Sequence, residues 1–91
     1  MLTGKEKRAL RAQGNRTIAE VQVGKAGVTP GLIQNIDNAL STKELVKIKI
    51  LRNCPLEKTE VAQEISQQLE AEVVQILGRT LLIYRPLPEE Q

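Results

Sequence analysis

Successive segments of this chain space their apolar residues first with the period of a strand and then with the period of a helix. This alternation of strand-like and helix-like segments is the feature that most constrains the fold. Residues 17–23 alternate at every second position, whereas residues 30–41 place their apolar side chains on one helical stripe. A strand-like run at 45–51 and a second helical stripe at 60–70 follow. Such a succession is typical of α/β proteins, in which helices connect parallel strands of one sheet.

Three threonines stand where helices are expected to begin. Thr3, with Glu6 three residues later, has the spacing of a capping box and predicts a helix over residues 4–13. Thr29 and Thr59 precede the second and third helical stripes, where their hydroxyl groups can accept a hydrogen bond from the first turn. The sequence therefore predicts three capped helices.

The last third of the chain predicts a hairpin. The β-rich runs 72–77 and 80–85 are separated only by Gly78-Arg79, which is typical of a two-residue turn. Both faces of the hairpin are apolar, and strict alternation would place Val74 and Ile76 on one face with Val73 on the other.

The complete order is α-β-α-β-α-β-β, which predicts an α/β sandwich with a four-stranded mixed sheet. The second and third helices should share one face of that sheet. We expect the first helix, or a partner, to cover the other face, because the hairpin is apolar on both sides. At 91 residues the chain has room for one domain, which we place at residues 1–86, and the two prolines after Arg85 predict a short tail at 87–91.

The composition excludes several classes of function. Histidine is absent, so the usual general base near neutral pH is missing, and the single Cys54 can form neither an internal disulfide nor a thiolate metal cluster. We therefore expect no enzyme, no cofactor, no metal site and no small-molecule substrate. Tyr84 is the single aromatic residue, which argues against binding RNA by stacking several bases on flat side chains.

The chain also lacks the marks of a membrane or secreted protein. Its longest apolar run, near residues 81–84, is far shorter than the about 20 residues that cross a bilayer. The charged amino terminus leads into no apolar signal segment. We expect a cytoplasmic protein that acts as a monomer.

Charge is distributed unevenly along the sequence. Residues 1–53 carry ten Lys or Arg and four acidic residues, whereas residues 54–91 carry three Lys or Arg and seven acidic residues. If the fold keeps the two halves on different surfaces, one side of the molecule attracts polyanions.

Gly24-Lys25-Ala26-Gly27 connects the first predicted strand to the second predicted helix. A phosphate can approach a backbone closely where no Cβ intrudes, and a loop that leads into a helix offers free N–H groups. KH domains clamp a nucleic-acid backbone by the same means. A tight turn that needs its glycines only for their backbone angles is the competing interpretation.

The candidate contacts to a nucleic acid comprise this loop and basic residues before and after it. The predicted contacts are Gly24, Lys25, Ala26, Gly27 and Val28 in the loop, Lys5, Lys7, Arg8 and Arg11 on the first helix, and Lys47, Lys49 and Arg52 on and after the second strand. For the basic residues, an ordinary solvated helix or strand face is the alternative.

Two long segments, 22–40 and 44–50, resemble the CRM domain of chloroplast RNA splicing and ribosome maturation proteins. The opening residues 2–5 and the ending 78–85 are similar to its free-standing bacterial YhbY type. Residues 14–18 depart from the pattern, because many relatives carry a histidine and a Leu-Lys-Pro segment there. The resemblance implies an RNA-binding module whose fold is similar to the C-terminal domain of the third bacterial initiation factor.

For a single-domain bacterial member, the resemblance further implies association with precursors of the large ribosomal subunit. The expected partner is then ribosomal RNA, bound during ribosome assembly. The alternative is a non-enzymatic adaptor whose basic half binds an acidic protein.

Overall fold

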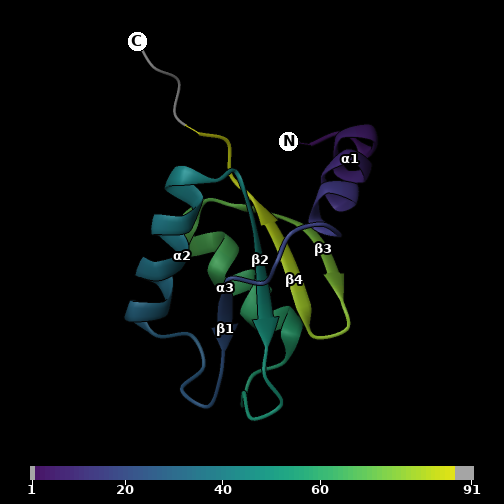
Figure 1. Cartoon of the computed structure of the whole chain (residues 1–91). Helices are drawn as coiled ribbons and strands as arrows, with labels where there is room; N and C mark the ends of the chain where they lie inside the picture. The colour runs from purple at the N-terminus through teal and green to yellow at the C-terminus, as the bar shows by residue number, and fades with distance from the viewer. Residues whose placement is uncertain (1, 88–91) are drawn as a thin grey trace.

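The computed structural model describes residues 2–87 and contains one four-stranded sheet with helices on both faces (Figure 1). The elements follow the predicted order and are α1 (Gly4–Gly14), β1 (Val21–Val23), α2 (Pro30–Thr42), β2 (Leu45–Ile50), α3 (Lys58–Leu69), β3 (Glu72–Leu77) and β4 (Thr80–Tyr84). The predicted α/β fold with a mixed sheet is therefore confirmed. Of the predicted tail at 87–91, only Leu87 lies within the described residues, where it is exposed.

The strand order of the sheet is β1-β2-β4-β3. β1 runs parallel to β2, and β4 lies between β2 and β3 and is antiparallel to both. β1, β2 and β3 consequently all point the same way, so the connections that follow these three strands emerge at one edge of the sheet (Figure 1).

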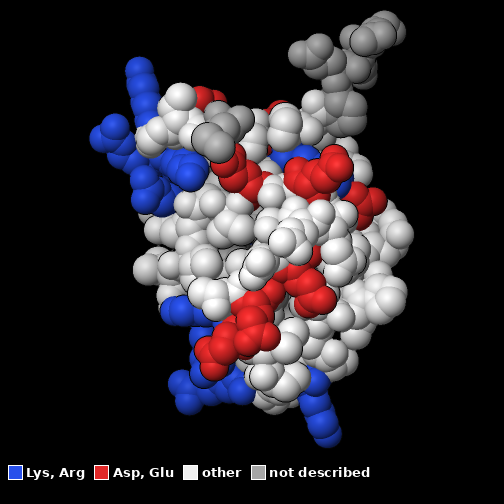
Figure 2. Space-filling model, turned by 180° about the vertical axis from the view of Figure 1, so that it is seen from behind, with Lys and Arg blue, Asp and Glu red and all other residues white. Residues whose placement is uncertain are grey.

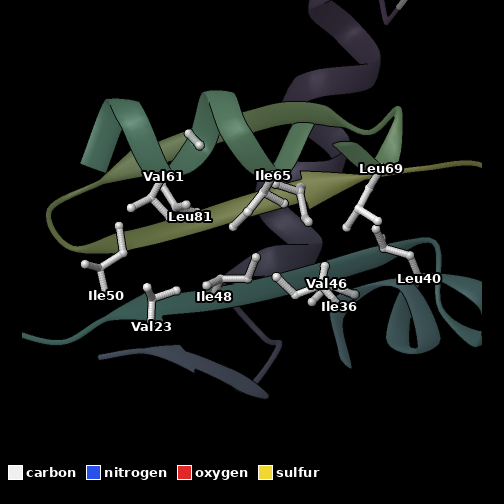
Figure 3. Packing of buried hydrophobic residues seen from close by; sticks show 12 residues of the cluster. Val23, Ile36, Leu40, Val46, Ile48, Ile50, Val61, Ile65, Leu69 and Leu81 are labelled. Carbon is white, nitrogen blue, oxygen red and sulfur yellow. The ribbon is translucent and has the colours of Figure 1, made fainter. Parts of the chain in front are cut away.

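The main core lies between the sheet and the helices α2 and α3. Val61, Ile65 and Leu69 point from α3 toward the sheet, and Ile36 and Leu40 come from α2 (Figure 3). The sheet contributes Val23, Val46, Ile48, Ile50, Leu81 and Ile83. Full burial of an aliphatic side chain of this size contributes about 1.5–3 kcal/mol, which makes this layer the main source of stability.

α1 covers the other face of the sheet, which decides the alternative that the sequence left open. Leu2 and Leu10 of this helical segment pack on a small cluster formed by Leu45, Val74 and Leu82. Thr3 and Glu6 form the predicted capping box.

Glycine at position 14 allows the end of α1 to approach the sheet closely. A Cβ on Gly14 would lie only 2.4 Å from Cδ2 of Leu82, so a side chain there cannot fit without a shift of its neighbour. The Nζ of Lys47 donates to the carbonyl oxygen of Gly14 at 3.4 Å. The end of α1 is thus held directly on the middle of β2 and β4.

β1 is shorter than the predicted strand over 17–23. Residues 15–20 must cross the sheet from the end of α1 to the outer edge of β2, so most of them cannot pair (Figure 1). Glu20 donates its N–H to the oxygen of Lys47 at 3.2 Å, while Ile18 is 83% exposed. The alternating pattern before Val21 therefore does not mark a paired strand.

Two other local predictions are corrected. β3 contains a bulge between Val73 and Gln75, so Val73 and Ile76 face the main core while Val74 faces α1, contrary to strict alternation. α3 begins at Lys58 with Glu57 at the N-cap position, and Thr59 lies inside the first turn. The Glu57 side chain makes no capping hydrogen bond. The sequence therefore carries no capping signal at the true start of α3.

Candidate nucleic-acid interface

The glycine loop forms a tight turn between β1 and α2. The N–H of Gly27 donates to the oxygen of Gly24 at 2.9 Å, and this hydrogen bond closes the turn. Lys25 and Ala26 lie at its tip and are exposed. Thr29 then caps α2 as predicted, because its Oγ1 accepts from the N–H of Leu32 at 3.1 Å.

The two glycines of the loop serve different purposes. Gly27 is buried and has φ +67°, a conformation that other residues rarely adopt, and a Cβ there would lie 3.4 Å from Cδ1 of Leu56. Gly24 has no such backbone angle, and a Cβ there would make only ordinary contacts with Leu51 and Asn53, at 3.6 and 3.7 Å. The turn itself therefore accounts for Gly27 but not for Gly24.

The backbone of the loop offers free donors. Within residues 2–87, the N–H groups of Lys25, Ala26 and Val28 have no protein acceptor. The side chain of Val28 packs against the main core, so only its backbone can reach a ligand. Free N–H groups in an exposed loop beside a helix start are suited to bind an anionic oxygen.

Two other connections lie beside the glycine loop at the same edge of the sheet. The segment after β2 is anchored by the N–H of Leu51, which donates to the oxygen of Val23 at 2.8 Å. On its other side, the N–H of Ile50 donates to the oxygen of Arg79, in the turn between β3 and β4, at 2.7 Å. We call this edge, with its three connections, the loop end; ligands of α/β proteins commonly bind outside the carboxyl ends of strands.

The loop end is rich in cationic side chains from separate segments. Its exposed basic residues are Lys25, Lys49, Arg52, Lys58 and Arg79. Arg52, Lys58 and Arg79 line one open hollow of about 380 Å³, together with Glu57. The ion pairs found among residues 2–87, Lys43–Glu20 and Arg85–Asp37, involve none of these five cations. The loop end is therefore a positively charged surface whose free donors lie at one side, on the glycine loop that follows the edge strand β1.

Sequence reasoning did not select Lys58 or Arg79 as site residues. Both belong to the acid-rich half of the chain, so the charge pattern drew attention away from them. The predicted topology contained the missing signal, since β3 runs parallel to β1 and its following turn must emerge at the same edge.

The predicted cations of α1 lie elsewhere. The N–H of Leu2 donates to Oε2 of Glu72, the first residue of β3, at 3.2 Å, so the start of α1 lies at the amino ends of the strands. Figure 2 shows positive side chains gathered mainly at two ends of the molecule, over α1 and at the loop end, with acidic side chains between them. In the group over α1, Lys5 and Arg8 are exposed, whereas Lys7 and Arg11 are partly buried. The structure thus divides the predicted contacts into two groups.

The single aromatic side chain is held in the fold. Tyr84 packs beside the cluster under α1 and lies opposite Leu45 in the sheet. Partial burial, with the nearby carboxylates of Glu44 and Glu6, raises the pKa of the Tyr84 hydroxyl above its ordinary value of 10.0. The phenol is therefore neutral at physiological pH.

Other ligand chemistries find little support in residues 2–87. No group of three Cys, Asp or Glu side chains is arranged there to hold a metal ion. No helix of this described part is both long and apolar enough to cross a bilayer. Cys54 is half-buried, with its Sγ 3.8 Å from the oxygen of Leu56.

Known proteins similar to this chain have names that refer to RNA. It is 37% identical over 91 residues to "Probable RNA-binding protein YqeI" of Bacillus subtilis, covering all of this chain and 95% of that protein. It is 32% identical over 88 residues to "RNA-binding protein" of Haemophilus influenzae, covering 97% of this chain and 89% of the relative.

The fold and the family agree with these similarities. The solution structure of protein SAV1595 from Staphylococcus aureus superposes with a TM-score of 0.82 at 37% identity, covering all of this chain and 95% of the other. The CRS1 / YhbY (CRM) domain model matches residues 2–85. The chain therefore belongs to the CRS1/YhbY (CRM) domain family.

Proposed function

We propose that this protein binds RNA and that the loop end clamps the RNA backbone. The observation that carries the proposal is that, within residues 2–87, free N–H groups at Lys25, Ala26 and Val28 coincide with five cations that form no ion pair. A phosphate on the loop would accept from the backbone, and neighbouring phosphates would lie near Arg52 and Arg79. Gly24, which the turn does not require, leaves space for this approach.

The names of the relatives support RNA as the polyanion, and the composition favours contacts to its backbone over base stacking. Similar proteins carry RNA-binding names, and the chain lacks the aromatic side chains that would stack several bases. The role is binding rather than catalysis. By the family resemblance, the RNA is ribosomal and belongs to cytoplasmic precursors of the large subunit.

Salt dependence tests the backbone clamp. The logarithm of the affinity for a single-stranded RNA should fall linearly with the logarithm of the salt concentration, with a slope of about −0.7 per neutralised phosphate. Lys25→Ala and Arg52→Ala should each weaken binding and reduce the slope by about 0.7, because each removes one phosphate contact.

The matched control is Lys43→Ala, which removes an equally exposed charge paired with Glu20, outside the loop end. Its affinity and slope should equal those of the wild type. If Lys25→Ala and Arg52→Ala also leave both quantities unchanged, the loop end is not the RNA site.

The ribosomal assignment needs a separate measurement. Tagged protein should recover precursors of the large subunit from cell extract, and nuclease treatment should abolish this recovery. A protein partner that survives nuclease would contradict the RNA proposal and support the adaptor alternative.

A further inference from the structure

A small hollow lies on the sheet face between the end of α1 and the turn that joins β3 and β4. Its walls come from the α1 terminus and from three strands, and it is lined by Gly14, Asn15, Lys47, Gln75, Leu77, Thr80 and Leu82. Its volume is about 70 Å³, which corresponds to about five water molecules. α1 leaves this lower part of the sheet face uncovered (Figure 1).

The lining combines an apolar floor with groups that both donate and accept hydrogen bonds. Leu82 forms the buried base, and Leu77, which is 63% exposed, forms an apolar rim. The side-chain amides of Asn15 and Gln75 have no hydrogen-bond partner within residues 2–87. No acidic residue lines the hollow. This set of groups matches the edge and faces of a nucleobase better than it matches a phosphate.

The hollow is fixed before any ligand arrives. One wall is the end of α1, which meets Leu82 without an intervening side chain at Gly14. Lys47 donates to the carbonyl oxygen of Gly14, which links that wall to β2. A preformed site loses little conformational entropy on binding.

The hollow is also continuous with the loop end along the sheet. Lys49 lies opposite Gln22 and Thr80, and Thr80 lies opposite Leu77 across β4 and β3. Lys47 and Lys49 are two residues apart on β2, so they share this face about 7 Å apart along the strand. An RNA strand that leaves the loop end over these lysines would reach the hollow.

We propose that this hollow binds one unstacked base of the RNA, with the amides of Gln75 and Asn15 reading its edge and Leu77 and Leu82 contacting its faces. The inference depends on the proposed RNA binding and adds base recognition to it. It also supplies a way for a chain with one aromatic residue to contact a base without a stacking platform.

The test uses the whole protein and a set of ten-nucleotide RNA strands of one length. One strand is fully abasic, and the other four carry a single A, C, G or U at the centre. Affinities are measured at low salt by fluorescence anisotropy for the wild type, Gln75→Ala, Asn15→Ala and, as a matched control on the outer surface of α3, Gln67→Ala. Thermal unfolding of each variant verifies the fold.

The wild type should bind at least one single-base strand between about fivefold and about a hundredfold more tightly than the abasic strand. Gln75→Ala and Asn15→Ala should each reduce this ratio by about twofold to tenfold and leave affinity for the abasic strand unchanged. Gln67→Ala should change neither quantity.

Each contrary result has a distinct meaning. Equal binding of all five strands by the wild type, or an unchanged ratio in both variants, would overturn the base pocket while the backbone clamp stands. If the wild type binds neither these strands nor natural RNA, the proposed function fails, and the pocket fails with it.

Discussion

At the residue scale, the fold requires glycine at one position of the loop and not at the other. Gly27 is fixed by its left-handed backbone, with φ +67°, so the fold alone selects glycine there. Gly24 has an ordinary backbone and room for a methyl group. The turn therefore accounts for Gly27, whereas the proposed phosphate clamp concerns Gly24.

Alanine at each glycine should give opposite results. Gly27→Ala should lower the free energy of unfolding by about 1–2 kcal/mol, because alanine resists the left-handed conformation. Gly24→Ala should change it by less than about 1 kcal/mol but weaken RNA binding, since the new methyl group obstructs the phosphate. Urea denaturation and anisotropy measure the two effects. If Gly24→Ala binds RNA as tightly as the wild type, a close approach of the phosphate to the backbone at this position is excluded.

At the element scale, helix packing depends on a few specific contacts. Arg85 connects the end of β4 to α2 and α3, because its guanidinium donates to Oδ1 of Asp37 at 2.8 Å and to the oxygen of Leu69 at 3.2 Å. Within residues 2–87, α1 has no such ion pair and is held on the opposite face by Leu2, Leu10 and the close approach at Gly14.

The approach at Gly14 yields a stability prediction. Gly14→Ala should destabilise the protein by about 1–3 kcal/mol, because the added methyl group collides with Leu82. In a Leu82→Ala background, which is itself destabilised, Gly14→Ala should cost less, so the two effects should not add. Urea denaturation of the four proteins of this cycle measures the coupling. If the changes in the free energy of unfolding of the two single variants simply add in the double variant, the methyl group at position 14 does not collide with Leu82.

The order of helices and strands was predictable from the sequence because apolar periodicity and helix caps depend on neighbouring residues. The length of β1 and the bulge in β3 were not predictable, because they depend on contacts with residues far away in the sequence. Ile18 alternates like a strand residue, but the position of α1 forces its segment across the sheet. The bulge at Val74 lets this residue reach Leu82 and α1, a contact that no local pattern encodes. The hollow beside Gly14 likewise brings together Asn15 and Gln75, which are 60 positions apart.

At the scale of the whole molecule, the cations form two groups with a strand length between them. β2 spans six residues, or about 20 Å, between the amino ends near α1 and the loop end, and the described chain is 39 Å in its longest dimension. The acidic side chains seen between the two groups in Figure 2 disfavour a polyanion on that side. RNA that contacts both groups must therefore be long enough to cross the molecule over the face that α1 leaves open.

This separation predicts an effect of RNA length. The double substitution Lys5→Ala and Arg8→Ala should weaken binding of a single strand of about fifteen nucleotides but not of one of about five, because the short strand occupies only the loop end. Lys25→Ala should weaken both. Anisotropy at one salt concentration gives the comparison. If the double substitution lowers the affinity for both RNA lengths equally, α1 and the loop end contact the same short segment of RNA.

The strand order has a consequence for folding of the protein during its synthesis. β4 is the last strand in sequence and yet stands between β2 and β3, and its Leu81 and Ile83 are fully buried. The amino-terminal part of a nascent chain emerges first, but β2 and β3 have no common neighbour until residues 80–84 are present. Closure of the sheet must therefore await synthesis of residues 80–84.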